Sequence, residues 1–92
     1  SECDAKLDGS YTLGPNPVTS AFNYYLTITN NIIEMSTVYI YNMYGSLVIA
    51  GPSFDGTIGQ DHKIYMGDLD ADLYIVRIVS ATNVRTYNII KQ

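Results

Sequence analysis

The sequence has no tryptophan, only one cysteine and one histidine, and few charged residues. A single cysteine, Cys3, cannot form a disulfide within the chain. Cys3 is therefore either a lipid attachment point or an incidental thiol, and both interpretations stay open. No apolar run reaches the roughly 20 residues that span a bilayer, and the first ten residues lack the apolar core of a secretory signal. We expect no membrane insertion, and a chain that is either a mature form or a fragment of a longer protein.

Positive charge is also scarce. Five Lys and Arg residues stand against nine Asp and Glu residues, which gives a formal net charge of −4. Nucleic acids are bound by Lys and Arg, which displace counterions from the phosphates, so a nucleic-acid partner is not expected. The same balance argues against binding to anionic membranes.

Three aspartates, Asp68, Asp70 and Asp72, have the alternating spacing that begins a calcium-binding loop. Such a loop also needs glycine at its sixth position and glutamate at its twelfth. Counted from Asp68, these positions hold Leu73 and Val79, so the standard loop is excluded. A looser calcium site that recruits Asp55 and Asp61 stays open as an alternative.

The single histidine, His62, has no cysteine at metal-ligand spacing and no Ser and Asp arrangement that indicates a catalytic triad. We expect it to be a surface residue at the start of a strand. The glycines of "FDGTIGQ" lack the strand and helix context of a phosphate-binding loop. The sequence therefore predicts no catalytic, cofactor-binding or metal-binding residue.

What the sequence does contain is tyrosine, nine residues of it, together with many Val, Ile and Thr residues that suit strands. Apolar and polar residues alternate in short segments separated by turn residues, which predicts an all-β antiparallel sandwich of about seven strands. A single domain is expected over residues 11–92, with residues 1–10 as a leader or edge strand. The expected strands span 11–13, 23–29, 37–42, 47–50, 62–66, 73–79 and 84–90, and 51–61 is expected to be a loop.

Two local patterns refine this fold. In immunoglobulin-like sandwiches a tyrosine near the start of a late strand bonds back to the backbone a few residues upstream. Tyr74 fits that position, so Tyr74, Val76 and Ile78 should face the core, while Arg77 faces solvent with Leu73 and Ile75. The segment "PNPV" is compatible with a sheet edge but not with the middle of a sheet, because Pro15 and Pro17 have no N–H group to donate.

The abundance of tyrosine leaves a carbohydrate-binding face open, with Tyr39, Tyr41, Tyr44 and Tyr65 as candidates. Tyrosines that alternate on strands are more often half-buried partners across neighbouring strands.

The segments "PNPV", "VYIYNMYGSLV", "LYIVRI" and "IIKQ" resemble the C-terminal sorting domain of the Bacteroidetes type IX secretion system. The resemblance covers residues 14–92. It matches Pro15 and Pro17 to the opening motif, Gly45 to a turn glycine, Tyr74 to a late tyrosine and Lys91 to a basic residue near the end. It implies an immunoglobulin-like export module that is usually cleaved off at the cell surface.

The sequence departs from that family at three places. Asp72 stands where glycine is usual, Asn88 stands where lysine is common, and the gap between "PNPV" and "LTI" is a few residues longer. Glycine adopts a positive φ at no steric cost, so a positive φ at Asp72 would support the alignment.

A second resemblance is to small secreted Bacteroides sandwiches of unknown function that begin with a "KGSW"-like block. It is carried by "LDGSY" at 7–11 and "PVTSAFNYYLTI" at 17–28. Both resemblances imply an exported, non-catalytic domain.

Our leading hypothesis is a sorting module whose residues Ile89, Ile90, Lys91 and Gln92 are recognised by the secretion machinery. The first alternative is a free-standing secreted or surface module that binds a glycan or another surface protein. The second alternative is a structural subunit that assembles through its sheet edges. The expected location is secreted, periplasmic or on the outer-membrane surface.

Overall fold

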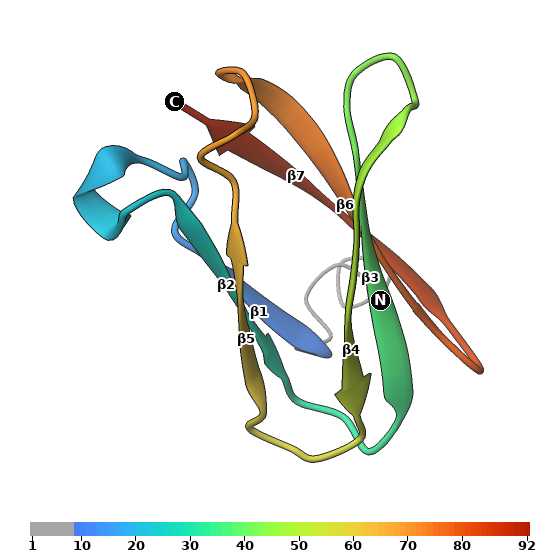
Figure 1. Cartoon of the computed structure of the whole chain (residues 1–92). Coiled ribbons are helices and arrows are strands. Elements are labelled where there is room, and N and C mark those ends of the chain that lie inside the picture. Colours follow the sequence, from blue (N-terminus) through green and yellow to red (C-terminus); the bar gives the residue numbers. More distant parts are fainter. Residues whose placement is uncertain (1–8) are drawn as a thin grey trace.

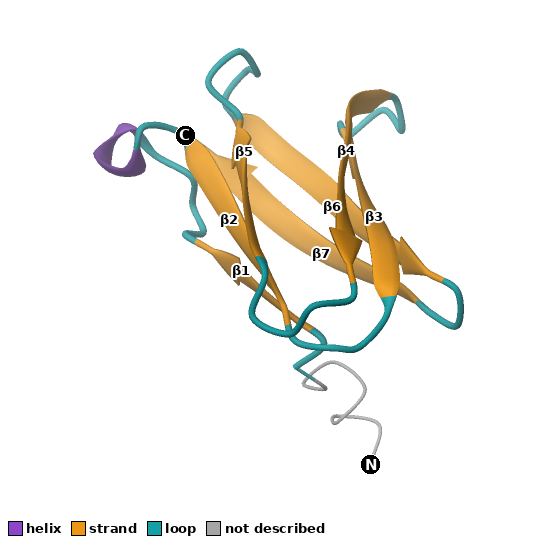
Figure 2. Cartoon of the chain, turned by 60° about the horizontal axis from the view of Figure 1, so that its bottom comes forward, coloured by secondary structure: helices purple, strands orange, loops and turns teal. Residues whose placement is uncertain are grey.

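Two antiparallel sheets pack face to face in the computed structural model, which describes residues 9–92 (Figures 1 and 2). The first sheet has the order β1 (Tyr11–Gly14), β2 (Tyr25–Asn30) and β5 (Asp61–Tyr65). The second sheet has the order β4 (Leu47–Asp55), β3 (Met35–Tyr41), β6 (Asp72–Ser80) and β7 (Val84–Lys91). A short 3₁₀ turn, η1 (Ser20–Phe22), follows β1. The predicted seven-stranded sandwich is confirmed, and Cys3 lies outside the described residues.

The core lies between the sheets and is built by the alternation predicted from the sequence. Every second residue of a strand points to the same side, so strands with apolar residues at that spacing bury one face. The fully buried side chains include Leu26 and Ile28 on β2, and Val38 and Ile40 on β3. Burying one such side chain contributes roughly 1.5–3 kcal/mol. In the described part of the chain, no helix is both long and apolar enough to cross a membrane.

The strand β6 has the predicted phase. Tyr74, Val76 and Ile78 are buried and Arg77 is exposed. The Tyr74 hydroxyl donates a hydrogen bond of 2.7 Å to the carbonyl oxygen of Asp70. This confirms the predicted tyrosine corner, which fastens the turn containing the three aspartates to the start of β6.

The strand β4 is longer than predicted, because residues 51–55 were expected to be loop. Gly51 adopts a φ of 92° next to Pro52, and the pairing with β3 shifts register between Thr37 and Tyr39. Gly and Pro in this segment therefore mark a bulge rather than the end of the strand. Beyond the bulge the strand continues and places Phe54 in the core at 1% exposure.

His62 lies at the start of β5, as predicted, but it is not a fully exposed surface residue. His62 shares the inward phase of Ile64 on β5 and is half-buried. Its ring centroid lies 4.7 Å from that of Phe54, and its Nε2 lies 2.9 Å from the carbonyl oxygen of Ser53. The imidazole therefore packs between β5 and β4 at the margin of the core.

Asp72 does not have the positive φ that would have supported the alignment with the sorting-domain family. In the described chain only Asn23 and Tyr24 combine a side chain with a positive φ. The Asp72 carboxylate accepts a hydrogen bond of 2.8 Å from the N–H of Leu73. The conformational freedom of glycine is thus not used at this position.

Replacing Tyr74 by phenylalanine should destabilise the fold by about 1–2 kcal/mol, because the Asp70 carbonyl loses its donor in a partly buried place. Urea unfolding of the two proteins measures this difference. Tyr44→Phe is the matched control, because Tyr44 is 91% exposed. Equal midpoints for both variants would contradict the role given to the corner.

Stability should also fall at alkaline pH in a way that depends on Tyr74. Burial, followed by the charges of Asp70 and Asp72, raises the pKa of the Tyr74 phenol above 10.0. Above pH 10 the unfolded chain therefore releases this proton before the folded chain does, so stability declines as pH rises. Urea unfolding between pH 8 and 11 should show a shallower decline for Tyr74→Phe, and identical slopes would count against the assignment.

Candidate recognition site at the C-terminal strand

The outer edge of β7 is covered near its end by the segment that follows β1. Val18 forms a parallel bridge with Lys91. The Val18 N–H donates to the carbonyl oxygen of Ile90 at 2.7 Å, and the Gln92 N–H donates to that of Val18 at 2.9 Å. The C-terminus consequently lies beside the connection between β1 and β2 (Figure 2).

Asn16 completes this pairing with its side chain. Its Oδ1 accepts a hydrogen bond of 2.9 Å from the Ile90 N–H, and its Nδ2 donates one of 3.1 Å to the carbonyl oxygen of Asn88. Pro15 and Pro17 on either side have no N–H group, so the side-chain amide supplies the donor that the backbone lacks. We call Asn16 and Val18, with the residues 88–92 that they bind, the C-terminal clip. The segment "PNPV" thus lies at a sheet edge, which is the position that its two prolines allow.

Lys91 is held inside this end of the sandwich at 9% exposure. Its ammonium group donates a hydrogen bond of 2.8 Å to the carbonyl oxygen of Leu69. It also lies 4.6 Å from the centroid of the Tyr24 ring, within the range of a cation–π interaction. These two contacts offset part of the cost of removing the charge from water.

The four residues proposed from the sequence for export recognition do not share one face. Ile89 is 2% exposed and Lys91 points to the same side, whereas Ile90 is 48% exposed and Gln92 is exposed. This division follows from strand alternation. Ile89 and Lys91 belong to the interior, and Ile90 and Gln92 are available to a partner.

Ile90 stands on an unusually apolar solvent face of the second sheet. It pairs with Leu73 across β6 and β7, and Ile75 lies two residues further along β6. Solvent faces of antiparallel sheets are commonly polar. We name this surface the outer apolar face; its apolar members are Tyr39, Tyr41, Leu73, Ile75, Val79, Val84 and Ile90, and Arg77 adds one charge.

Three of the aspartates singled out from the sequence, Asp55, Asp61 and Asp72, accept local hydrogen bonds. Asp55 accepts from Thr57, and this bonding holds the pKa of its carboxyl below the usual value. Asp61 accepts from the Thr29 hydroxyl. Among residues 9–92, no three His, Cys, Asp or Glu side chains come together in a group that could hold a metal ion.

The four tyrosines considered for carbohydrate binding are dispersed. Tyr39 and Tyr41 lie on the second sheet, Tyr44 lies in the β3–β4 turn, and Tyr65 lies on the first sheet. Tyr65 pairs instead with Tyr25, at 5.3 Å between ring centroids. The sequence analysis did not identify this contact between Tyr25 and Tyr65. The two residues are direct partners in the antiparallel pairing of β2 and β5, so aligning the predicted strands is a way to find such contacts.

Asn16 was also missed as a functional residue. The signal for it was present in the sequence, because an amide side chain between two prolines can replace the backbone donors that they remove.

Gly45 does occupy a turn, with a φ of 82° and its N–H bonded to the Asn42 carbonyl.

Comparison with known families gives a match over most of the chain. Residues 12–92 match the family described as the secretion system C-terminal sorting domain. The chain belongs to this family. It is a C-terminal sorting domain for type IX secretion, as the first of the two resemblances implied. The family is a sorting-signal family and not a catalytic one, and substrates of this system are exported to the cell surface or released.

A solved structure shares the fold. It is PorZ of Porphyromonas gingivalis, described as an essential bacterial surface component of the type IX secretion system. The TM-score is 0.69 at 15% sequence identity, and the match covers 96% of this chain and 12% of PorZ. This chain therefore corresponds to a small part of that protein, and the likeness concerns the fold. No curated protein matches the sequence.

Asn16→Ala should destabilise the sandwich by about 1–2 kcal/mol, because it leaves the Ile90 N–H and the Asn88 carbonyl without their partners. Urea unfolding measures this change. Asn16→Asp keeps the acceptor for Ile90 but sets a carboxylate oxygen against the Asn88 carbonyl, so it should also destabilise the sandwich.

The matched control is Asn31→Ala, which removes a single side-chain bond to Thr12 on the first sheet. If Asn16→Ala costs no more than this control, the clip contributes little to the fold.

Proposed function

We propose that the secretion machinery recognises the C-terminal end in its folded form, through Ile90 and the adjoining part of the outer apolar face. Ile89 and Lys91 hold that end within the sandwich. The observation that carries this proposal is the alternation of burial along the last strand, with Ile90 at 48% exposure between Ile89 at 2% and Lys91 at 9%.

The contacts of Lys91 support this division of roles. For a partner to bind its ammonium group directly, Lys91 would have to leave the Leu69 carbonyl and the Tyr24 ring. Giving up a charge-assisted hydrogen bond costs roughly 1.5–3 kcal/mol before any new contact forms. Ile90 needs no such rearrangement, because its side chain already faces solvent beside Leu73.

The surface around Ile90 suits a protein partner. Interfaces commonly have an apolar centre in which charged residues are depleted. Leu73 and Ile75 extend the apolar surface from Ile90 toward the middle of the sheet, where Arg77 provides a single positive charge. A partner surface with an apolar centre and one acidic side chain would complement it.

The domain acts without catalysis in this proposal. Its only histidine is engaged with the Ser53 carbonyl and packs against Phe54, which leaves it poorly placed to serve as a general base. The partner is the type IX machinery, and after export the domain reaches the outer-membrane surface or the medium.

The test uses a reporter fused to the complete 92-residue chain in a host with a functional type IX system. Ile90→Asp should abolish export or reduce it by about tenfold or more, because it places an unpaired charge at the centre of an apolar contact. Export is measured as reporter activity at the surface and in the medium.

Val84→Asp is the matched control, because Val84 lies on the same strand and the same face and is 46% exposed. It should leave export nearly unchanged, and both variants should retain the thermal stability of the parent. Equal losses for both variants would refute the assignment to Ile90.

Lys91→Met separates folding from recognition. It should lower the thermal stability and reduce export only as far as the folded fraction falls. Complete loss of export with unchanged stability would contradict the proposal, because it would show that the machinery binds the Lys91 side chain directly.

A further inference from the structure

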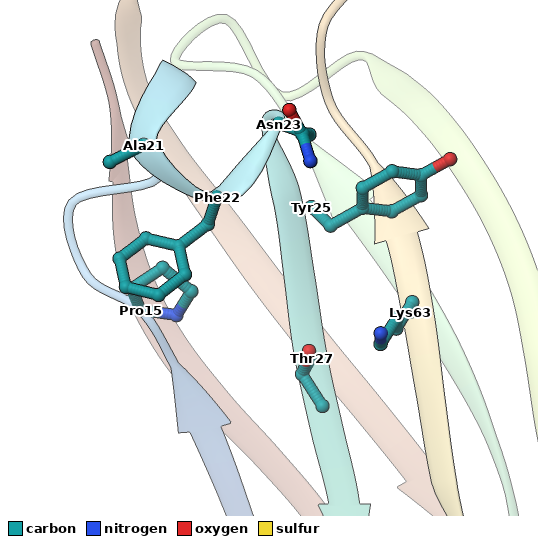
Figure 3. Close-up of a pocket in the computed structure, with 7 residues that line it drawn as sticks. All are labelled: Pro15, Ala21, Phe22, Asn23, Tyr25, Thr27 and Lys63. Atoms are coloured by element: carbon teal, nitrogen blue, oxygen red, sulfur yellow. The ribbon is translucent and has the colours of Figure 1, made fainter.

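An open cleft lies on the outer face of the first sheet, away from the surface assigned to sorting (Figure 3). It has a volume of about 580 Å³ and is lined by Pro15, Phe22, Asn23, Tyr25, Thr27 and Lys63. Volumes of roughly 300–1,000 Å³ are typical of small-ligand sites. We call it the outer cleft.

One wall of the outer cleft is a rigid turn. The N–H groups of Phe22 and Tyr24 both donate to the Thr19 carbonyl, at 3.2 and 3.0 Å, and the Asn23 N–H donates to Ser20. Asn23 and Tyr24 adopt φ values of 56° and 61°, a conformation that costs of order 1–3 kcal/mol for each residue other than glycine. Such strain is often retained at binding sites, because it fixes the positions of neighbouring side chains.

Asn23 and Tyr24, the two residues with positive φ, orient the backbone so that the side chains of Tyr24 and Tyr25 point to opposite sides of the first sheet. Tyr24 turns inward against Lys91, and Tyr25 turns outward into the cleft. Phe22 and Tyr25 are 58% and 40% exposed, so the cleft presents aromatic rings to solvent. Tyr65 packs against Tyr25 from β5 and helps to fix its ring. Aromatic rings held in this way are suited to stacking against the apolar face of a pyranose ring.

Polar groups complete the lining. The amide of Asn23 and the hydroxyl of Thr27 can exchange hydrogen bonds with sugar hydroxyls. Lys63, which pairs with Thr27 across β2 and β5, brings a positive charge into a chain whose net charge is −4. Lys63 is exposed on β5, and Asp61 two residues away on the same face accepts a hydrogen bond from the Thr29 hydroxyl. An anionic group on the ligand would pair with the Lys63 ammonium group.

We propose that the outer cleft binds a saccharide that carries a carboxylate, such as a uronic acid. Phe22 and Tyr25 contact the sugar ring, Asn23 and Thr27 bind its hydroxyls, and Lys63 binds the carboxylate. The outer cleft lies on the first sheet, so the proposed site is separate from the recognition of Ile90 on the second sheet.

The probe is trigalacturonic acid, titrated into the complete chain at low ionic strength and followed by amide chemical shifts. Saturable binding in the millimolar range or tighter is expected, with shift changes confined to η1, β2 and β5. The fully methyl-esterified trisaccharide has the same rings without the charges and should bind about tenfold more weakly.

Lys63→Gln should reduce affinity for the acid about tenfold and leave that for the ester unchanged, whereas Phe22→Ala should weaken both. Arg77→Gln and Tyr44→Ala remove an exposed cation and an exposed aromatic ring elsewhere, and neither should have an effect. Reporter export should be unchanged in Lys63→Gln, which keeps this test separate from that of sorting.

Three results would overturn the proposal. The first is the absence of saturable binding to the acid, and the second is equal affinity for acid and ester. The third is tighter binding of a glutamate-rich hexapeptide at the same residues, which would identify the cleft as a peptide site.

Discussion

The arrangement of the C-terminal end depends on one requirement. The backbone groups at the outer edge of the last strand need hydrogen-bond partners, and the segment after β1 provides them. An edge strand exposes a row of N–H and C=O groups that would otherwise pair with another chain. Near the end of β7, the clip binds the backbone groups of Ile90 and Gln92 through Val18, and those of Ile90 and Asn88 through the side chain of Asn16. Pairing with β6 and strand alternation set Lys91 inward and Ile90 outward, and the clip holds this end of the strand in that arrangement. Assembly through this part of the edge, one of the functions considered from the sequence, would require the clip to open.

The segment that forms the clip also shapes the opposite sheet. Val18 is fully buried, and the next residue, Thr19, caps the 3₁₀ turn with its side chain and its carbonyl. The turn leads into the two residues with positive φ, which place Tyr24 against Lys91 and Tyr25 in the outer cleft. One connection between β1 and β2 therefore supports both the end proposed for sorting and the proposed saccharide site. The two surfaces lie on different sheets, so each can be occupied without blocking the other.

The sequence predicted those features that depend on local alternation or on a single residue type. The buried phase of Tyr74, Val76 and Ile78 followed from period-two spacing, and the edge position of Pro15 and Pro17 followed from their missing donors. Features set by distant contacts were not predictable. The strand through Gly51 and Pro52 continues because β3 accepts a bulge there, and the packing of the His62 ring against Phe54 joins strands of two different sheets. Likewise, alternation puts Lys91 on the same face as Ile89, but its partners Leu69 and Tyr24 come from other segments and could not be read from its own strand.

Amide hydrogen exchange tests most directly whether the C-terminal end is part of the folded sandwich. The N–H groups of Ile90 and Gln92 are bound by Asn16 and Val18, whereas Thr86 lies on the same strand beyond the clip. We expect Ile90 and Gln92 to exchange much more slowly than Thr86, with protection at Ile90 close to that of the buried strands. Exchange of Ile90 and Gln92 at the rate of an unstructured peptide would contradict the account, because the C-terminal residues would then be presented as a free tail.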